Sequence, residues 1–324
     1  MSRLRAALLG VLVLVLGALF VVARLCGLGG THPGPVPTPG PSHGPSPGPS
    51  PTTAPTSPAA GPSVAPPSPT PAGALFRIGT LNWRGASHYL KDPHRGERPY
   101  DVRVPNMIDK IDDSRVSIVG FQEFEPRQER AFLRATKGHW GLVTGTSETG
   151  RRDTRDAVAY RTDVWRVDKV RTLSIVYAGR HRVRIPLARF TGLAGTPAHG
   201  HAVWVLNTHN PASVRFIGGT AVSRAYDVAL EAAALRRLAS RKPHTGVLFT
   251  GDMNSKTAFR DLFLGLAGPG WTTADPADEP DLIDWIMGGP GVGFAGTTVD
   301  WSTKDHARRY TDHPFVHTAV TALP

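Results

Sequence analysis

The sequence predicts an α+β domain in which two packed β-sheets are flanked by helices. Three observations support this fold class. Apolar runs of strand length outnumber the helical stretches across residues 74–324. The helical stretches are interspersed among these runs, as they are in layered domains. The run Ala202–Thr208 is apolar on both faces, as expected for a strand that is covered on two sides.

The first part of this region alternates strands and helices. One helix is predicted because Val104, Met107, Ile108 and Ile111 repeat at the i, i+3, i+4, i+7 spacing of a buried helix face. The predicted elements are, in order, a strand at Leu75–Asn82, the helix around residues 104–111, a strand at Ser117–Phe121 and a helix at Gln128–Thr136.

Strands dominate the rest of the region. The one helix predicted there, Tyr226–Leu238, is amphipathic, with Leu230, Leu235 and Leu238 on one side. The predicted strands are Asp156–Tyr160, Trp165–Leu173, Val183–Phe190, Ala202–Thr208, Gly246–Thr250, Leu282–Met287, Val292–Val299 and Phe315–Thr321.

The first 73 of the 324 residues differ in composition from the rest, and they contain no Asp or Glu. An uninterrupted apolar stretch, Ala6–Ala23, is followed by residues 31–73, which are mainly Pro, Ser, Thr and Gly and offer almost nothing to bury. We therefore expect a signal anchor or signal peptide at 1–26, a disordered linker at 27–73 and one folded domain at 74–324.

The apolar stretch predicts where the domain resides. Its 18 residues are at the short end of what spans a bilayer. Arg3 and Arg5 precede it, which favours an N-terminus inside the cell and export of the rest. We expect an extracytoplasmic domain that is anchored in the membrane by this one helix. The alternative is cleavage near Ala23, which would release a secreted protein.

The charge of the chain suits a polyanionic partner. The net charge is +11, and Arg3, Arg5 and Arg24 account for three of these charges, which leaves +8 for the folded domain. Nucleic acid or an anionic lipid surface would fit this excess, although a soluble basic protein without such a partner is the alternative. The single cysteine, Cys26, precedes the domain, so disulfide and thiol chemistry are excluded from it.

Polar residues follow several predicted strands directly. A carboxylate, amide or imidazole in such a position is held rigidly and still faces solvent. Metal-assisted hydrolases present their ligands, bases and oxyanion donors in this way. The residues concerned are Asn82, Glu123, His209, Asp252, Asn254, Asp284, Asp312 and His313.

The order Asn, Glu, His, Asp-x-Asn, Asp and Asp-His resembles that of the endonuclease/exonuclease/phosphatase superfamily, which has the deoxyribonuclease-I-like fold. The resemblance covers about residues 75–324. It implies a four-layer α/β/β/α sandwich of two mixed sheets flanked by helices, with the site at one edge of the sheets. It also implies Mg²⁺-dependent cleavage of phosphodiesters or phosphomonoesters, with Mn²⁺ as a possible substitute.

Three positions depart from the family pattern. Met253 stands where Phe or Leu is usual, Thr311 replaces a Ser, and Asn210 rather than Leu follows His209. None of these departures removes a chemical group that the reaction needs.

The resemblance implies metal ligands. Glu123 is the first candidate because Mg²⁺ binds a few carboxylate oxygens and keeps several waters. Asn82 and Asp312 are expected beside it. In the alternative interpretation, Glu123 is an ordinary exposed carboxylate after a strand, and Asn82 only caps a strand.

The resemblance also implies catalytic roles. Asp252 positions the attacking water, and Asn254, which would point the same way in extended chain, supports the phosphate or the metal. A simple Asp-x-Asn turn is the alternative. His209 protonates the leaving oxygen or binds phosphate, unless it is a buried histidine satisfied by backbone groups.

His313 is expected at the phosphate. Adjacent residues on a strand point to opposite faces, so Asp312 is not expected to be the partner of His313. Asp284 would accept the other imidazole N–H of His313, and Asp281 is the alternative for that role.

The substrate is predicted less sharply. Ten arginines crowd residues 151–189, and they either track a nucleic-acid backbone or form a solvated basic face. DNA or RNA is the first candidate. A phospholipid, sphingomyelin or phosphoinositide head group is the second, and a non-catalytic surface binding module ranks below both. No protein partner is inferred, and we expect a monomer.

Overall fold

The computed structural model describes residues 73–324 except 178–180, 213–219, 277–278, 280 and 305–309. The predicted anchor at Ala6–Ala23 and nearly all of the predicted linker lie outside the described residues. In the part that is described, no helix has both the length and the apolar character needed to cross a bilayer.

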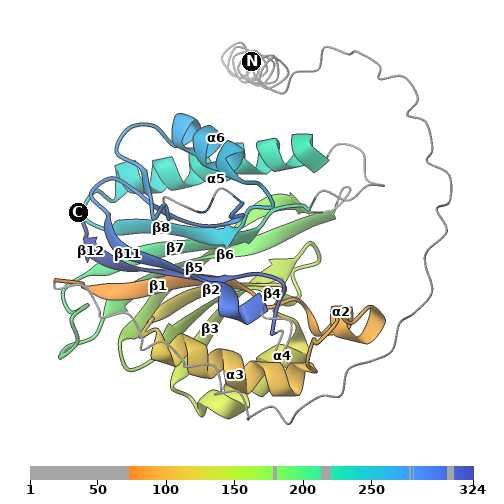
Figure 1. Ribbon diagram of the computed structural model, residues 1–324. Coiled ribbons are helices and arrows are strands. Elements are labelled where there is room, and N and C mark those ends of the chain that lie inside the picture. Colours follow the sequence, from red (N-terminus) through yellow and green to blue (C-terminus); the bar gives the residue numbers. More distant parts are fainter. Residues whose placement is uncertain (1–72, 178–180, 213–219, 277–278, 280, 305–309) are drawn as a thin grey trace, which may run out of the picture. The chain divides into compact units, whose positions relative to one another are not determined.

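The twelve strands of the described residues form one mixed sheet that folds into two facing halves (Figure 1). One half has the order β11-β12-β1-β2-β4-β3, and the other has the order β6-β7-β8-β10-β9, with β5 paired to β6. The strands are β1 (Phe76–Asn82), β2 (Ile118–Gln122), β3 (Trp140–Ser147), β4 (Arg152–Arg161), β5 (Trp165–Tyr177), β6 (His181–Gly192), β7 (Ala202–His209), β8 (Gly246–Asp252), β9 (Thr272–Thr273), β10 (Asp284–Gly288), β11 (Gly293–Asp300) and β12 (Phe315–Ala322).

Strand β6 joins the two halves. Its residues Val183 and Arg184 pair with β3, whereas Leu187 to Thr191 pair with β7. Gly145 lies at this junction, where a Cβ atom would come within 2.3 Å of the Arg184 carbonyl oxygen. The mixed sheet and its flanking helices confirm the predicted α+β fold class. The halves are joined by hydrogen bonds at β3–β6 rather than forming two separate sheets.

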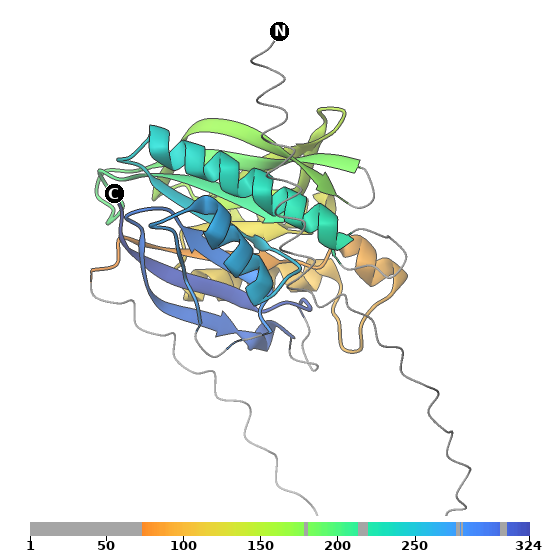
Figure 2. The ribbon, with the colours of Figure 1, turned by 90° about the horizontal axis from the view of Figure 1, so that it is seen from above.

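Three apolar cores hold four layers together. Between the half-sheets, Ile78, Ile118 and Leu248 belong to one core and are fully buried. Helices α5 (Thr220–Arg241) and α6 (Thr257–Ala267) cover the β6–β8 half, and α3 (Tyr100–Asp113) and α4 (Pro126–Thr136) cover the β1–β2 half (Figures 1 and 2). Each large apolar side chain buried in this way contributes about 1.5–3 kcal/mol to stability.

Each predicted strand and helix overlaps an observed one, but five observed elements were not predicted: α2 (Ala86–Lys91), β3, α6, β9 and the short 3-10 helix η2 (Trp301–Lys304). The sequence of β3 lacks a strong strand pattern because it contains two glycines. Gly141 is required there, since a Cβ atom would overlap the Tyr160 ring at 2.3 Å. Helix α6 did carry a signal, because Phe259, Phe263 and Ala267 repeat every four residues and are all buried.

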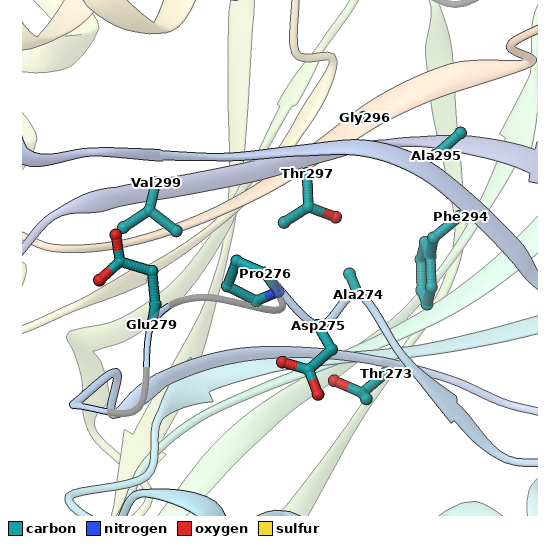
Figure 3. A pocket seen from close by; sticks show the side chains of 10 residues that line it. All are labelled: Thr273, Ala274, Asp275, Pro276, Glu279, Phe294, Ala295, Gly296, Thr297 and Val299. Atoms are coloured by element: carbon teal, nitrogen blue, oxygen red, sulfur yellow. The ribbon is translucent and has the colours of Figure 1, made fainter.

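A cavity of about 470 Å³ lies between β11 and the segment after β9 (Figure 3). It is lined by residues such as Asp275, Glu279 and Phe294, and by none of the predicted site residues. Its two carboxylates are already bonded, Asp275 to the Arg260 guanidinium and Glu279 to the Trp301 indole N–H.

Candidate active site

Strand directions bring the predicted site residues to one edge of the sandwich. Strands β1 and β2 run parallel, as do β7 and β8, so the ends of these four strands lie at the same edge. Strands β10 and β12 run antiparallel to β8 and β1, so they begin where the others end. Residues that are up to 231 positions apart in the sequence, Asn82 and His313, therefore meet at this edge.

Three of them form a row across neighbouring strands. His209 stands opposite Asp252 in the β7–β8 pairing, and Asp284 stands opposite Asp252 in the β8–β10 pairing. We call His209, Asp252 and Asp284 the catalytic row. Their exposed fractions are 6%, 1% and 0%, so their positions are fixed by the strand register and the surrounding core.

Asn82 connects this row to the other half-sheet. Its Nδ2 donates hydrogen bonds to Asp252 Oδ2 at 3.0 Å and to Glu123 Oε1 at 3.1 Å. Its Oδ1 accepts the backbone N–H of Arg84 at 2.8 Å. Asn82 therefore acts here as a bridge between two carboxylates.

His313 forms a pair with Asp284. Its Nδ1 lies 2.9 Å from Asp284 Oδ2, and its Nε2 lies 3.6 Å from Asp252 Oδ2. Burial opposes protonation of His313, but the Asp284 and Asp252 carboxylates outweigh burial and raise its pKa to about 10. Asp281 instead pairs with Lys256 at the surface, so the contact with His313 belongs to Asp284. Both Asp312 and His313 precede β12, so the alternation of a strand does not separate them.

His209 and Asn254 contact each other. Asn254 Nδ2 lies 3.0 Å from His209 Nε2. The same Nδ2 donates to the Asn210 carbonyl oxygen at 2.8 Å. Asn254 does not continue the strand in extended form, since its φ is +47° and its backbone N–H turns back to Asp252 Oδ1 at 2.9 Å. Asn254 therefore holds both His209 and Asp252.

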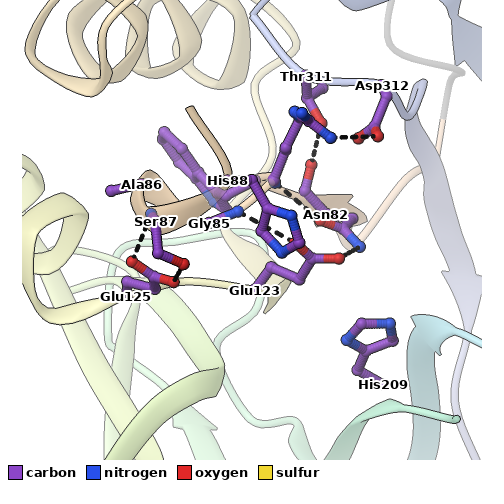
Figure 4. A network of polar contacts seen from close by, with 12 residues as sticks. Asn82, Gly85, Ala86, Ser87, His88, Glu123, Glu125, His209, Thr311 and Asp312 are labelled. Atoms are coloured by element: carbon purple, nitrogen blue, oxygen red, sulfur yellow. Dashed lines mark hydrogen bonds and ion pairs between the residues drawn. The ribbon is translucent and has the colours of Figure 1, made fainter. Parts of the chain in front are cut away.

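Glu123 faces the opening of the site, with 23% of its side chain exposed. Its Oε2 accepts the backbone N–H of Gly85 at 3.1 Å and lies 3.3 Å from His88 Nε2 (Figure 4). Burial alone would raise the pKa of Glu123, but the charge of His209, the hydrogen bonds from Gly85 and Asn82 and the charge of His88 lower it overall. Glu123 is therefore an ionised carboxylate at neutral pH.

Asp312 is held in place by Arg84. Arg84 Nη1 lies 3.2 Å from Asp312 Oδ2, and the Arg84 Nε also contacts both Glu97 oxygens at 3.1 Å. Burial opposes ionisation of Asp312, but His313 and Arg84 keep its pKa low. The neighbouring Thr311 hydroxyl donates to the Asn82 carbonyl oxygen at 2.7 Å.

The donor set suits a hard divalent cation, because carboxylate oxygens predominate in it. Atoms of Asp252, Asp284 and His313 lie within 4.8 Å of one another. Asp284 and His313 are already bonded to each other, which favours a role as a carboxylate–imidazole pair. Glu123 is partly exposed and is linked to Asp252 through Asn82, so it is a carboxylate beside the row that an incoming ion can reach.

Several residues at the site were missed by the sequence reasoning. Arg84 stands two residues after Asn82 and joins the site through Asp312. His88 reaches Glu123 from α2. The Tyr177 ring packs edge-on against His209, with 5.6 Å between ring centroids. Arg224 is half-buried at the start of α5; burial lowers its pKa, and the nearby Asp252 carboxylate opposes this shift. Of these residues, only Arg84 could have been found from the sequence, because it stands two positions after Asn82.

Comparison with known proteins agrees with this geometry. The sequence profile described as the Endonuclease/Exonuclease/phosphatase family matches residues 85–313, well over half of the chain. No curated protein sequence matches the chain.

Solved structures share the fold. An endonuclease/exonuclease/phosphatase family protein from Bacteroides thetaiotaomicron is 17% identical with a TM-score of 0.59, and the match covers 76% of this chain and 97% of that one. The mannosyl-6-phosphatase Bt3783 of the same organism is 16% identical with a TM-score of 0.57, covering 76% and 99%. A humanized D. rerio TDP2 is 13% identical with a TM-score of 0.59, covering 76% and 98%. The chain therefore belongs to the endonuclease/exonuclease/phosphatase family of hydrolases, which act on phosphoester bonds.

Proposed function

We propose that the chain is a divalent-metal-dependent phosphodiesterase and that nucleic acid is its substrate. The observation that carries this proposal is the set of contacts among Glu123, Asn82, the catalytic row and His313 at one edge of the sheet. These groups supply a carboxylate open to solvent, a buried carboxylate between two imidazoles, and a positively charged histidine.

The proposed cation is Mg²⁺, with Mn²⁺ as a substitute. Glu123 would hold it, and Asn82 and Asp312 remain the other proposed ligands. When bound, the ion would polarise a phosphoryl oxygen and neutralise charge in the transition state.

The protein's own residues would perform the remaining steps. Asp252 is fixed by the Asn254 N–H and the Asn82 amide, so it can orient a water for attack and take its proton. His313 is a cation at neutral pH because its pKa is raised to about 10, and it would stabilise negative charge on the phosphate oxygens. His209, positioned by Asn254, would bind the phosphate or protonate the leaving oxygen.

A polyanionic substrate is supported by the charges around the site. Arg155 lies next to the site, because its carbonyl oxygen accepts the N–H of Phe124, the residue after Glu123. The Arg155 side chain is 60% exposed. Arg182 lies exposed on β6, beside the Tyr177–His181 pair that closes the β5–β6 hairpin. Together with Arg224, these arginines are cations near the site that a nucleic-acid backbone would contact.

A lipid or sugar phosphate is the second candidate. The apolar stretch Ala6–Ala23 would hold the domain near membrane lipids such as sphingomyelin or phosphoinositides. One structure with the same fold is named a mannosyl-6-phosphatase, which keeps phosphomonoesters open as well. A non-catalytic binding module ranks below both.

One panel tests the reaction and the substrate together. The full-length chain in detergent is incubated with supercoiled plasmid, RNA, sphingomyelin vesicles and phosphoinositide vesicles, each with Mg²⁺, with Mn²⁺ and with EDTA. We expect plasmid and RNA to be cleaved, EDTA to abolish cleavage, and affinity to fall steeply with salt because bound phosphates release counterions. Asp252→Asn serves as the inactive control. Hydrolysis of lipid alone would replace nucleic acid with the second candidate, and hydrolysis of nothing would leave the binding module.

We further propose that Ala6–Ala23 anchors the chain, with the domain outside the cytoplasm as a monomer. Cell fractionation with protease accessibility tests the anchor and its orientation. A soluble extracellular form that begins after Ala23 would show that the segment is cleaved instead.

A further inference from the structure

A buried carboxyl group beside the site has no use in the reaction proposed above. Asp156 on β4 is 8% exposed, and its Oδ1 is buried without a hydrogen-bond partner among the described residues. The adjacent Arg155 does not neutralise it, because that guanidinium pairs with Asp153 at 3.4 Å. Buried polar atoms are almost always hydrogen-bonded, so an unpaired one requires an explanation.

Strand geometry directs Asp156 into the space between the half-sheets. Alternate residues of a strand share a face, and Val158 on the same face of β4 belongs to the core between the halves. Phe121 and Ala157 form the last pair of the β2–β4 ladder, so Gln122 and Asp156 both follow this pair at the active-site end. Gln122 Oε1 is likewise buried without a partner in the described part of the chain.

The surroundings of Asp156 connect it to the catalytic row. Burial is the main cause that raises the pKa of Asp156 well above its ordinary value, and Asp153, Asp252 and Glu123 add to it. Burial and then the Asp156 carboxyl raise the pKa of Tyr177, whose ring packs against His209. Asp156 is therefore close enough to the row and to Tyr177 for these groups to act on one another's pKa.

We propose that Asp156, Gln122 and Tyr177 form a subsite beside the catalytic row that binds a hydroxyl group on the alcohol portion of the substrate, as a sugar or polyol carries. Two buried oxygens without a hydrogen-bond partner call for a ligand that can hydrogen-bond to both. A hydroxyl group both donates and accepts, so it suits the Gln122 oxygen and the Asp156 carboxyl in either protonation state. A cationic ligand would need an ionised carboxylate, which burial disfavours. This inference rests on the proposed phosphodiesterase activity.

The test compares substrates that differ in their hydroxyl groups. Bis(p-nitrophenyl) phosphate has none, a ribodinucleotide and glycerophosphoinositol have them on a sugar and on a polyol, and p-nitrophenyl phosphorylcholine carries a cation instead. We expect Asp156→Ala to lower the ratio of kcat/KM for the hydroxyl-bearing substrates to that for bis(p-nitrophenyl) phosphate by about tenfold. The substrate with the larger change identifies the sugar or the polyol as the source of the hydroxyl.

Two further variants make the result specific. Asp153→Ala removes the neighbouring acid of the same strand, and we expect the ratio to stay as in the wild type. Asp156→Asn keeps hydrogen bonding without a charge and should retain most of the preference, and it also serves if Asp156→Ala does not fold.

Three results would overturn the subsite. The first is an equal loss on all substrates with a lower melting temperature, which indicates a structural role only. The second is a loss confined to the phosphorylcholine ester, which indicates a cation site. The third is an unchanged ratio in an active enzyme. If the wild type hydrolyses none of the four substrates, the proposed function itself fails, and the subsite fails with it.

Discussion

The two sides of the active site are built in different ways. The catalytic row, His209, Asp252 and Asp284, stands on neighbouring strands and is almost fully buried. On the other side, Glu123, Asp312 and His88 lie outside the strands, and 23%, 33% and 53% of their side chains are exposed. Glu123 and Asp312 lie in loops, and His88 lies on the short helix α2; we call these three residues the loop group.

This difference suggests a division of labour. Groups that act on the reacting atoms must be held to a fraction of an ångström, which strand register and core packing provide. Groups that admit a cation or a substrate must be open to solvent and must adapt to it, as loop residues do. The row should therefore control the rate, and the loop group should control the affinity for the metal.

The largest effect is expected at the centre of the row. Asp252→Ala removes the carboxylate that both Asn82 and the Asn254 N–H hold in place, so we expect kcat to fall about 10³-fold. Steady-state hydrolysis of bis(p-nitrophenyl) phosphate at saturating Mg²⁺ measures the change. Asp281→Ala, an exposed aspartate paired with Lys256, is the matched control and should stay within about twofold of the wild type. A comparable loss of kcat in Asp252→Ala and Asp281→Ala would show that Asp252 has no particular role in the rate.

A smaller loss, with a distinct pH signature, is expected at the end of the row. Asp284→Asn takes away the main partner of His313, and we expect kcat to fall about 10²-fold. In the wild type, His313 stays protonated until the pH approaches about 10. Without Asp284 its pKa should move down towards 6.5, so the activity should decline at a lower pH than in the wild type.

NMR titration of the His313 imidazole in metal-free protein measures this pKa directly. Because the folded-state pKa is raised, the protonated form stabilises the fold fully below pH 6.5, and the stabilisation is lost as the pH rises through about 10. The melting temperature should fall over this window in the wild type and much less in Asp284→Asn. An equal His313 pKa in the wild type and in Asp284→Asn would contradict the pairing of His313 with Asp284.

The same contrast explains what the sequence could predict. Residues of the row end or begin apolar strands, so their type and their position were visible in the sequence. The strand predictions also located Asn82 and Glu123. The partner of His313 could only be narrowed to Asp284 or Asp281, because the choice depends on which of them pairs in register with Asp252.

The loop group was less predictable because its contacts depend on chain paths that have no periodic pattern. Arg84 reaches both Glu97 and Asp312, 13 and 228 residues away, and nothing local announces either contact. Asn254 turns back through a positive φ instead of continuing the strand, so its amide holds His209. The β3–β6 junction was missed for a similar reason, since Gly145 matters only through its close approach to Arg184.

A Glu123 variant tests whether the loop group controls the affinity for the metal. Glu123→Ala removes the first of the proposed metal ligands, so the Mg²⁺ concentration for half-maximal activity should rise by about 30-fold. The loss of kcat at saturating Mg²⁺ should be smaller than that of Asp252→Ala. Activity measured across a Mg²⁺ series, with Glu125→Ala as the control on the same loop, separates the two effects. A fall in kcat with an unchanged Mg²⁺ requirement would place Glu123 with the rate-controlling residues.

The smallest effect is expected at the most exposed member of the loop group. His88 Nε2 lies 3.3 Å from Glu123 Oε2, but 53% of its side chain is exposed, and an exposed ion pair contributes little. His88→Ala should change the Mg²⁺ concentration for half-maximal activity by no more than about threefold. The Gly85 N–H and the Asn82 amide still hold Glu123 in that variant. A much larger change would mean that His88 positions the carboxylate as firmly as strand register positions Asp252, and the distinction between the row and the loop group would then fail.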